Sequence, residues 1–239
     1  MKAYSITDVG QVRKVNQDYV FCYPNSVGQL PNLFLVADGM GGHQAGDYAS
    51  RCCVETIATN VKNSQVRSPI GILENAIQEA NRTVFCQAEA DASLHGMGTT
   101  IVAATILGEE LYVANIGDSR AYLLREEMHQ ITEDHSWVEE MVRNGELERK
   151  DARHHKNKNV ITRAVGTNAL VQADFFELRM QKGDILLMCT DGLINMVEDE
   201  DIFDIVKQSM DIEVAGKELV RVANTNGGKD NIGIVLVEI

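Results

Sequence analysis

The sequence predicts an α+β fold in which helices pack outside antiparallel β-sheets. Short apolar runs rich in branched residues indicate buried strands, and they lack the strict strand–helix alternation of a parallel sheet. Three successive runs, at residues 99–107, 111–117 and 120–125, are separated by only a few residues each. Connections this short are typical of antiparallel neighbours, because a parallel crossover needs a dozen residues or more.

The strands come in three groups that helices separate. Three precede the first helices, three follow them, and the last two flank a second set of helices. They are predicted at about residues 2–7, 18–23, 33–38, 99–107, 111–117, 120–125, 185–190 and 232–238.

Helices are expected where apolar residues recur at intervals of three and four. The first covers about residues 44–62, and the second begins at Ser68-Pro69, a cap followed by a proline in the first turn. Two late helices follow, and Gly227 could close the last one. The apolar stripes that mark them are Ala45, Ala49, Cys52, Cys53, Thr56, Ile57 and Val61; Leu73, Ala76, Ile77, Ala80, Val84 and Ala88; Ile202, Ile205 and Val206; and Val214, Leu219, Val222 and Ala223.

One segment, from Ser136 to about Val160, is crowded with charge. Ser136 to Glu139 has the form of a capping box, which predicts a short helix that Gly145 ends. The stretch that follows is basic and almost without apolar residues, so it cannot be core. We expect an exposed excursion, for which a functional loop and a solvated face are equally open interpretations.

Composition favours one domain, residues 1–239. The chain has three prolines, no low-complexity linker and no repeat of fixed period. Its net charge of −13 argues against nucleic acid or an anionic membrane as partner, so any anion site must be local. The odd number of cysteines, five, fits reduced core residues. With no signal peptide and no apolar run near ~20 residues, we expect a cytoplasmic protein. Nothing in the sequence requires more than a monomer.

Four aspartates stand beside glycines at the ends of apolar runs. Asp38, Asp118 and Asp191 each follow such a run, and Asp230 precedes one. Any one of them alone is typical of a tight turn. Together, carboxylates anchored at strand ends would form a site of hard oxygen ligands for Mg²⁺ or Mn²⁺. The glycines of Asp38-Gly39-Met40-Gly41-Gly42-His43 suggest a backbone packed closely against an ion or a phosphate.

A series of motifs in fixed order extends this pattern along the whole chain. The motifs are Thr7 to Asp18, Asp38 to His43, Gly96-Met97-Gly98-Thr99-Thr100, Gly117-Asp118-Ser119-Arg120, Asp134-His135-Ser136, Asn159 to Gly166, Thr190-Asp191-Gly192 and Lys229-Asp230-Asn231. In order and spacing the chain resembles the metal-dependent Ser/Thr protein phosphatases of type 2C, and the compact motifs are similar to the bacterial branch.

The resemblance implies a sandwich of two antiparallel sheets flanked by pairs of helices, with two Mn²⁺ or Mg²⁺ ions at one edge. It implies a variable flap at about residues 143–160 beside the site. By the family pattern Asp38 would bridge both metals, and the Gly39 carbonyl would bind one. Asp191 and Asp230 would complete the coordination of the first metal, and Asp18 would bind metal through a water molecule. Asp118, together with Asp191, would hold a third and more weakly bound ion. Asn231 would orient Asp230 or a water molecule.

The function implied is hydrolysis of phosphoserine and phosphothreonine on proteins by a metal-bridging hydroxide. Arg13 matches the family's phosphate-clamping arginine, a role suited to a planar, always charged guanidinium. The alternative is a catalytically weak pseudophosphatase that binds phosphoproteins. A haloacid-dehalogenase phosphatase is excluded because Val36 stands where its Asp-x-Asp motif needs the first aspartate. A local Ca²⁺-binding loop with ligands at alternate positions is not seen.

The general acid departs from the eukaryotic branch of the family. That branch has a histidine directly after the Asp-Gly pair, where this chain has Met40, which donates no proton. A metal-bound water or another group must therefore protonate the leaving oxygen. His43 is a candidate for this role, but we favour a purely structural role for it. For the basic residues Arg153, Lys156 and Lys158 of the flap, we hypothesise a role in steering phosphoproteins to an acidic enzyme.

Overall fold

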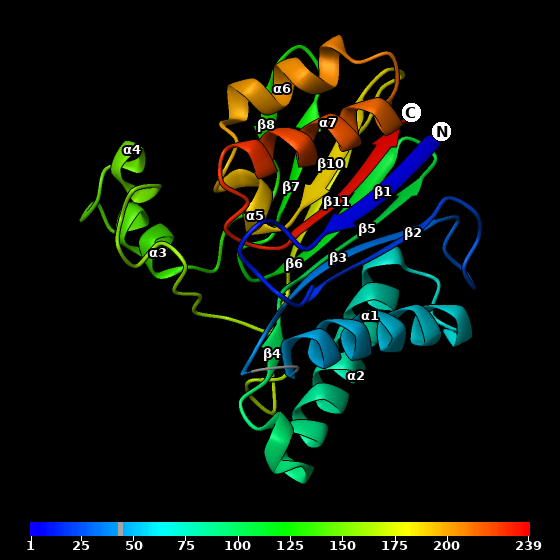
Figure 1. Ribbon diagram of the computed structural model, residues 1–239. Coiled ribbons are helices and arrows are strands. Elements are labelled where there is room, and N and C mark those ends of the chain that lie inside the picture. Colours follow the sequence, from blue (N-terminus) through cyan, green and yellow to red (C-terminus); the bar gives the residue numbers. More distant parts are fainter. Residues whose placement is uncertain (43–44) are drawn as a thin grey trace.

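Two antiparallel sheets lie face to face in a computed structural model that describes residues 1–42 and 45–239 (Figure 1). The first sheet has the order β1 (Lys2–Asp8), β11 (Ile232–Glu238), β10 (Ile185–Cys189), β7 (Arg120–Leu124) and β8 (Met128–Gln130). The second has the order β2 (Asp18–Tyr23), β3 (Leu33–Met40), β5 (Ile101–Leu107), β6 (Glu110–Ile116) and β9 (Asp174–Arg179), and the short β4 (Gly98–Thr99) also pairs with β3.

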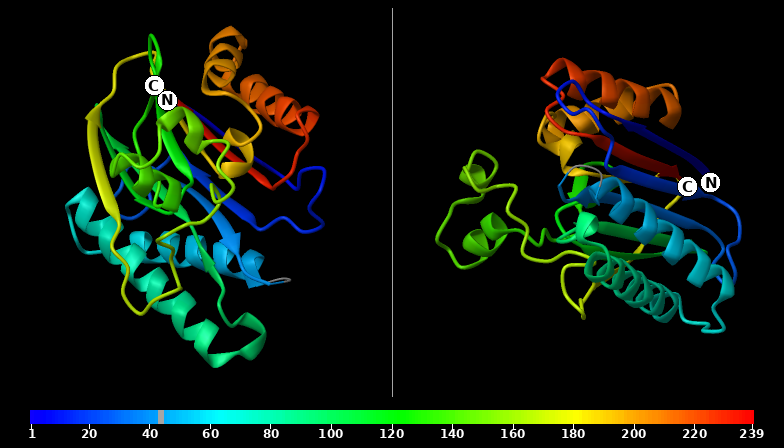
Figure 2. Two further views of the ribbon diagram at one scale, coloured as in Figure 1. Left: turned by 90° about the vertical axis from the view of Figure 1, so that its left-hand side faces the viewer. Right: turned by 60° about the horizontal axis from the view of Figure 1, so that its bottom comes forward.

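Helices cover both outer faces of the sandwich, which confirms the predicted fold class (Figures 1 and 2). The long pair lies on the second sheet, and the C-terminal helices lie on the first. The helices are α1 (Ala45–Asn63), α2 (Pro69–Ala90), the 3₁₀ turn η1 (Ala92–Leu94), α3 (Trp137–Arg143), α4 (Arg149–Ala152), α5 (Asp191–Ile194), α6 (Asp199–Gln208) and α7 (Ile212–Thr225).

Strand β3 shows how the sandwich is built, because it is buried on both faces. Phe34 and Val36 point into the core between the two sheets, whereas Leu33, Leu35 and Ala37 pack against the long helices. Alternate residues of a strand face opposite sides, so a strand covered on both sides reads as a continuous apolar run. The same run carries Asp38 to the edge of the sandwich.

The helix predictions succeed where the apolar stripe is long. All six residues of the α2 stripe are buried, and Ser68 caps the helix by accepting a hydrogen bond from the Gly71 N–H at 3.3 Å. Val214 is a wrong prediction, since its side chain is 44% exposed. Helix α7 instead buries Ala215, Leu219, Val220 and Ala223 with Ile212.

Some elements were not predicted. Strands β8 and β9 are edge strands of the two sheets, only partly buried, and carry no clean alternation of apolar and polar residues. Helices α4 and α5 have four residues each, too few to show a period. All five cysteines are free, as predicted, but Cys86 is exposed and therefore not a core residue.

The charged segment projects from the sandwich as a separate excursion (Figures 1 and 2). Its two ends are joined at a neck, where the Trp137 N–H bonds the Val160 carbonyl at 2.8 Å and the Thr162 N–H bonds the His135 carbonyl at 2.8 Å. Ser136 caps α3 as predicted, accepting from the Glu139 N–H at 3.2 Å. No residue from 139 to 163 is buried. We call residues 137–160 the flap.

The long helices of the described residues do not have the apolar character of membrane spans. This includes helix α2, which has 22 residues but is not apolar enough to cross a membrane.

Candidate active site

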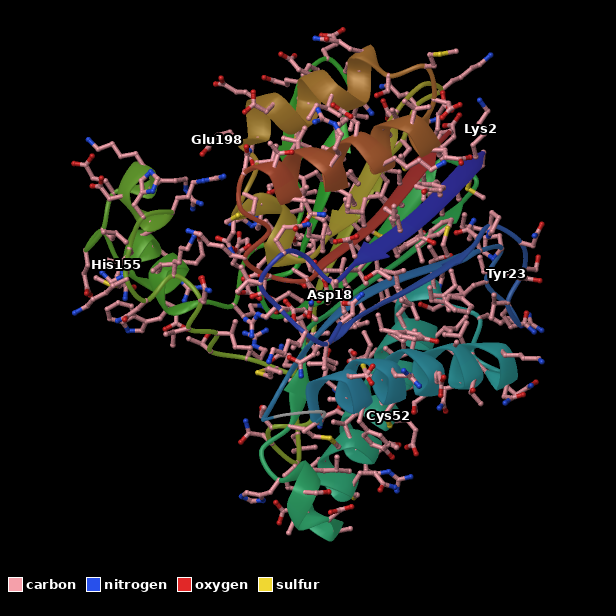
Figure 3. All side chains as sticks on the ribbon, viewed as in Figure 1. Lys2, Asp18, Tyr23, Cys52, His155 and Glu198 are labelled. Atoms are coloured by element: carbon pink, nitrogen blue, oxygen red, sulfur yellow. The ribbon has the colours of Figure 1, made fainter. Side chains whose placement is uncertain are left out.

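The predicted aspartates converge at the edge of the sandwich beside the flap. Asp18 starts β2 directly opposite Asp38 in β3, so the two sheet-end carboxylates are cross-strand neighbours. Asp191 opens α5 after β10, and Asp230 precedes β11. A cavity of about 240 Å³ brings Asp38, Asp118, Asp191 and Asp230 together with Gly39 and Arg13. Figure 3 shows Asp18 between α1 and the strands of the first sheet.

Two glycines allow this convergence because the backbone comes too close for a side chain. A Cβ on Gly39 would lie 1.9 Å from the carbonyl oxygen of Gly46 in α1, and one on Gly192 would lie 1.8 Å from that of Asn231. Both distances are far inside van der Waals contact. Gly192 therefore holds Asp191 against the segment that carries Asp230. The close approach expected of the glycines after Asp38 is to protein backbone, at Gly39.

The main chain of Asp38 is fixed by two threonines. Its N–H donates to the Thr100 hydroxyl at 2.9 Å, and its carbonyl accepts from the Thr100 N–H at 2.9 Å and from the Thr99 hydroxyl at 2.8 Å. The Thr100 hydroxyl in turn bonds the Ser119 hydroxyl at 2.7 Å, next to Asp118. These bonds fix the main chain of Asp38 at the place where its side chain lines the cavity.

Asp18 is held by a buried hydroxyl from the other sheet. The Thr190 hydroxyl donates to Asp18 Oδ2 at 2.7 Å and accepts from the Gly233 N–H at 2.8 Å. The second oxygen, Asp18 Oδ1, is buried and has no hydrogen-bond partner among the described residues. The same holds for Asp191 Oδ1, whereas Asp191 Oδ2 accepts from the Asn195 side chain at 2.9 Å.

Burial and mutual repulsion disfavour the charged forms of these carboxyls. Burial, followed by the charges of Asp18, Asp191, Asp118 and Asp230, raises the pKa of Asp38 well above its usual range. Burial also raises the pKa of Asp18 and of Asp118, with Asp191 adding to both. Burial, and then Asp230, raise the pKa of Asp191 to about 6. A positive charge at this place would relieve the repulsion.

The aspartate oxygens are ligands of the type that hard divalent cations prefer. In the structure, however, the carboxylates are not positioned to coordinate such an ion. Buried oxygens of Asp18 and Asp191 without partners are acceptors that a cation would satisfy. In the described part of the chain, however, no three acidic, histidine or cysteine side chains are grouped closely enough to hold one ion. Asp230 Oδ2 is engaged by Arg13 Nη2 at 2.7 Å, and Asp191 by Asn195. Binding would therefore require Asp230 to exchange Arg13 for the ion.

Arg13 lies on a loop that Asn231 secures. The Asn231 side chain accepts from the Gln17 N–H at 2.8 Å and donates to the carbonyls of Val9 and Val15 at 2.9 and 3.1 Å. Its backbone N–H donates to Asp230 Oδ1 at 2.9 Å. The orienting contact with Asp230 thus comes from the main chain of Asn231, and its side chain shapes the loop that presents Arg13.

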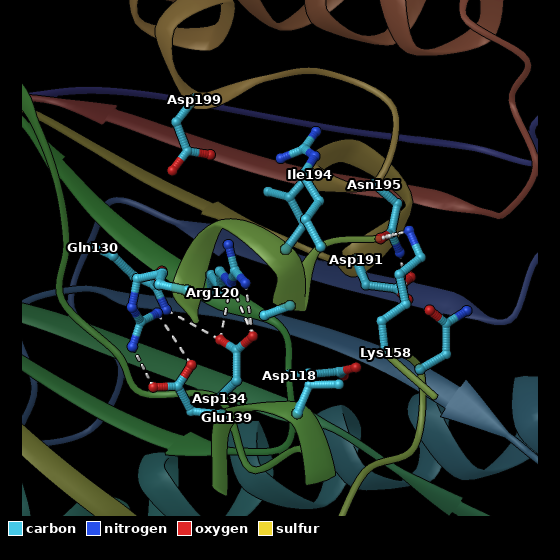
Figure 4. A pocket seen from close by; sticks show the side chains of 15 residues that line it. Asp118, Arg120, Gln130, Asp134, Glu139, Lys158, Asp191, Ile194, Asn195 and Asp199 are labelled. Carbon is cyan, nitrogen blue, oxygen red and sulfur yellow. Dashed lines mark hydrogen bonds and ion pairs between the residues drawn. The ribbon is translucent and has the colours of Figure 1, made fainter. Parts of the chain in front are cut away.

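Asp118 faces a second cavity, of about 210 Å³, between the flap and the first sheet (Figure 4). The backbone N–H of its neighbour Gly117 donates to the ring nitrogen Nδ1 of His135 at 3.0 Å, and the backbone N–H of His135 donates to the Gly117 carbonyl at 2.9 Å. Because Nδ1 accepts, the ring proton is on Nε2, which lies 2.9 Å from Asp174 Oδ2. Arg120 pairs with Asp134 through two of its nitrogens in the same cavity.

Sequence reasoning missed the residues that support the aspartates. Thr100, Thr190 and His135 all fall inside the quoted motifs, but nothing in their spacing indicates which carboxylate or loop each one bonds. Met40 lines the cavity, in line with its position after Asp38-Gly39. His43, the candidate for a proton role, lies outside the described residues.

Comparison with known proteins identifies the family of the chain. The family described as protein phosphatase 2C matches residues 2–232. A serine/threonine phosphatase stp from Listeria innocua is 40% identical over 100% of this chain and 96% of its own length. The structure of the serine/threonine phosphatase Stp1 from Staphylococcus aureus superposes with a TM-score of 0.93, at 34% identity, over 100% of this chain and 94% of that one.

A second similar structure contains metal. It is the catalytic domain of a serine/threonine protein phosphatase, PstP, in complex with two manganese ions, with a TM-score of 0.87, 31% identity and coverage of 99% and 97%. The match of fold, motif order and length extends over essentially the whole chain, so this protein is a member of the protein phosphatase 2C family.

Proposed function

We propose that this protein is a metal-dependent phosphatase that hydrolyses phosphoserine and phosphothreonine in proteins, with two Mn²⁺ or Mg²⁺ ions at the aspartate cluster. The observation that carries the proposal is the buried cluster itself. Asp38 is surrounded by four further aspartates that repel it, and two of their buried oxygens have no partner among the described residues. Such an arrangement is costly unless cations compensate it.

The proposed ligands follow from their place around the cavity. Asp38, fixed by Thr99 and Thr100, is central and would contact both ions, and the Gly39 carbonyl would contact one. Asp191 and Asp230 would complete the first ion. Asp18 would act through water, and Asp118 with Asp191 would hold a third ion. When bound, two divalent ions supply an acidified water at neutral pH and neutralise charge on the phosphoryl oxygens.

Arg13 would bind the phosphoryl group of the substrate. Its guanidinium is half-exposed at the cavity rim, and the hydrogen bond and charge of Asp230 raise its pKa further above its usual value. Once Asp230 turns to a cation, Arg13 is left with unused donors that point into the cavity. A tetrahedral phosphate offers the paired oxygens that a guanidinium recognises. Substrate phosphate would then replace Asp230 as the partner of Arg13.

The leaving serine or threonine oxygen needs a proton from a source other than Met40. Met40 lines the cavity but has no ionisable hydrogen. The residues Thr100, Asn159 and Ile161 that also line it have no acidic group near neutral pH. None of these four uncharged residues is therefore assigned to general acid catalysis.

The experiment compares Asp38→Asn with Asp204→Asn, a matched change at an exposed residue of α6. Hydrolysis of p-nitrophenyl phosphate and of a phosphothreonine peptide is measured with Mn²⁺, with Mg²⁺ and with chelator. We expect Asp38→Asn to lose at least about a hundredfold in kcat/KM, the scale seen when one electrostatic stabiliser is removed from an active site. Asp204→Asn should match the parent.

Two results would overturn the proposal. Turnover that persists in chelator would exclude metal dependence. Binding of phosphopeptide without turnover in any metal would favour the phosphoprotein-binding pseudophosphatase instead. Because Asp38→Asn keeps the shape of the side chain, a thermal melt of the same sample separates loss of ligation from loss of fold.

A further inference from the structure

A second opening lies beside the aspartate cluster, between the flap and the turn before β11. This cavity of about 270 Å³ has three walls: His154 and Lys158 from the flap, Asn195 and Met196 after α5, and Lys229 and Asp230 from the turn. We call it the flap cleft. It shares Asp230 with the catalytic cavity, so a ligand could extend from one into the other.

The flap cleft contains two lysines, Lys158 and Lys229, that form no ion pair with any other described residue, although Asp230 also lines the cleft. The Lys229 side chain is exposed, and no ion pair of the described residues includes it. Lys158 Nζ donates to Asn195 Oδ1 at 2.7 Å, a neutral partner. Burial lowers the pKa of Lys158, and the negative charge of Asp191 acts in the opposite direction. The positive charges of Arg153 and Lys229 also lower this pKa. The ammonium groups of Lys158 and Lys229 are therefore close enough to repel each other.

This arrangement is unusual for an acidic protein. With a net charge of −13, the chain has more than enough carboxylates to pair every surface cation. The flap shows this pairing elsewhere, because Arg149 bonds Glu139 and Arg153 bonds Glu198. Two lysines left beside each other in a cavity, with one of them held in place by Asn195, form a local anion site against the overall field.

The distance to the catalytic cavity fits a neighbouring side chain of the same substrate. Lys229 precedes Asp230 in the chain, so their Cα atoms are about 3.8 Å apart. An extended peptide advances about 3.3 Å per residue and directs alternate side chains to opposite faces. A residue within about three positions of the target phosphoresidue would therefore reach the flap cleft.

We propose that the flap cleft is a subsite for an anionic side chain, an acidic residue or a second phosphorylated one, near the phosphoserine or phosphothreonine to be hydrolysed. Lys229 makes the principal contact, and Lys158 the second, with Asn195 positioning Lys158. The proposal rests on the proposed function and adds substrate preference to it. Of the three basic flap residues first considered for steering phosphoproteins, Arg153, Lys156 and Lys158, the proposal keeps only Lys158. Arg153 is paired, and Lys156 lines none of the cavities beside the site.

The test uses three phosphothreonine peptides that differ at one neighbouring position, which carries alanine, aspartate or phosphoserine, on either side of the target. Enzymes are the parent, Lys229→Met, Lys229→Glu and the control Lys182→Met. Lys182 is an exposed lysine in the turn before β10, at the opposite end of that strand from Asp191. The readout is kcat/KM for dephosphorylation of the threonine alone, taken as the ratio of each anionic peptide to the alanine peptide, so a general loss of activity cancels and hydrolysis of the neighbouring phosphoserine is not counted.

We expect the parent to prefer anionic peptides by about twofold to fivefold, the range of an exposed charge pair. Lys229→Met should bring the ratio close to one, Lys229→Glu should invert it, and Lys182→Met should leave it unchanged. A preference for the phosphoserine peptide alone would identify the ligand as a phosphate dianion. A preference for both anionic peptides would identify it as any anion.

Two results would overturn the proposal, and they are distinguishable. If the parent hydrolyses all three peptides without preference, or if Lys182→Met changes the ratio as much as Lys229→Met, the subsite is wrong and the phosphatase activity stands. If the parent hydrolyses none of them with Mn²⁺ or Mg²⁺, the proposed function fails, and this inference fails with it.

Discussion

Replacement of Thr190 by valine tests whether Asp18 is held for metal binding by the other sheet. Thr190 is fully buried, and its hydroxyl both donates to Asp18 Oδ2 at 2.7 Å and accepts from the Gly233 N–H at 2.8 Å. Valine has nearly the same shape but makes neither bond. The change therefore removes two hydrogen bonds and creates almost no cavity.

The size of the effect follows from the groups left without partners. A hydrogen bond to a charged group contributes about 1.5–3 kcal/mol, and an unsatisfied buried N–H costs about 1–3 kcal/mol. The added methyl of valine and protonation of Asp18 offset part of this. We expect a loss of about 3 kcal/mol in the free energy of unfolding. For a chain of this length that corresponds to a fall in Tm of about 6–12 °C.

The matched control is Thr105→Val, on β5. Thr105 is also fully buried, but its hydroxyl donates to the Asn32 carbonyl at 2.9 Å, a neutral acceptor remote from the aspartates. Its loss should cost about 1 kcal/mol. Melts with chelator and with Mn²⁺ should show a smaller Mn²⁺-induced rise in Tm for Thr190→Val than for the parent, and an unchanged rise for Thr105→Val. Equal losses and equal metal responses in both variants would refute the reasoning.

Two further predictions concern the backbone approach and acid stability. Gly192→Ala should lower the free energy of unfolding, measured in urea, by more than about 3 kcal/mol, because the added Cβ would lie 1.8 Å from the Asn231 carbonyl oxygen. The control Gly71→Ala lies in a helix, and its Cβ would be 3.1 Å from a Val66 methyl, so its stability should hardly change. Similar losses of stability in the two variants would contradict the predicted clash at Gly192. Burial acts to raise the pKa of Asp184, but hydrogen bonds from Arg125 and the Gln181 backbone prevail and lower it. Ionised Asp184 therefore stabilises the fold above about pH 4, and this stabilisation is lost as the pH falls further. Asp184→Asn should lose less stability on acidification than the parent. Parallel curves of stability against pH for the two proteins would exclude this contribution of Asp184.

The fold was predictable where burial imposes a period over many residues. Helix α2 shows this, because its stripe repeats over about four turns and every member is buried. Strand β9 could not be predicted, since it pairs on one side only with β6 and its residues are mostly half-buried. Val214 misled the prediction because one apolar residue at helical spacing is compatible with either face of α7.

The candidate site divides in the same way. Asp38, Asp118, Asp191 and Asp230 were recognisable because each stands next to an apolar run, and the sheets then bring these ends together, whereas Asp18 follows a polar segment and was indicated only by the family resemblance. The partners of those aspartates were not recognisable, because Thr190 and Asp18 are 172 residues apart in the chain and meet only through the packing of the two sheets. Local sequence can identify a carboxylate at a strand end, but the hydroxyl that orients it depends on the tertiary arrangement.

The flap shows why a count of charges is a poor guide to an anion site. By sequence its basic residues form one cluster, and the natural inference is a general attraction for phosphoproteins. In the structure, Arg149, Lys150 and Arg153 each pair with a glutamate, so they contribute little net field. The positive charge left at the cavity wall comes from Lys158, and from Lys229, which the sequence places far from the flap. Anion recognition therefore depends on which cations the fold leaves unpaired, and a single lysine outside the cluster can outweigh the cluster itself.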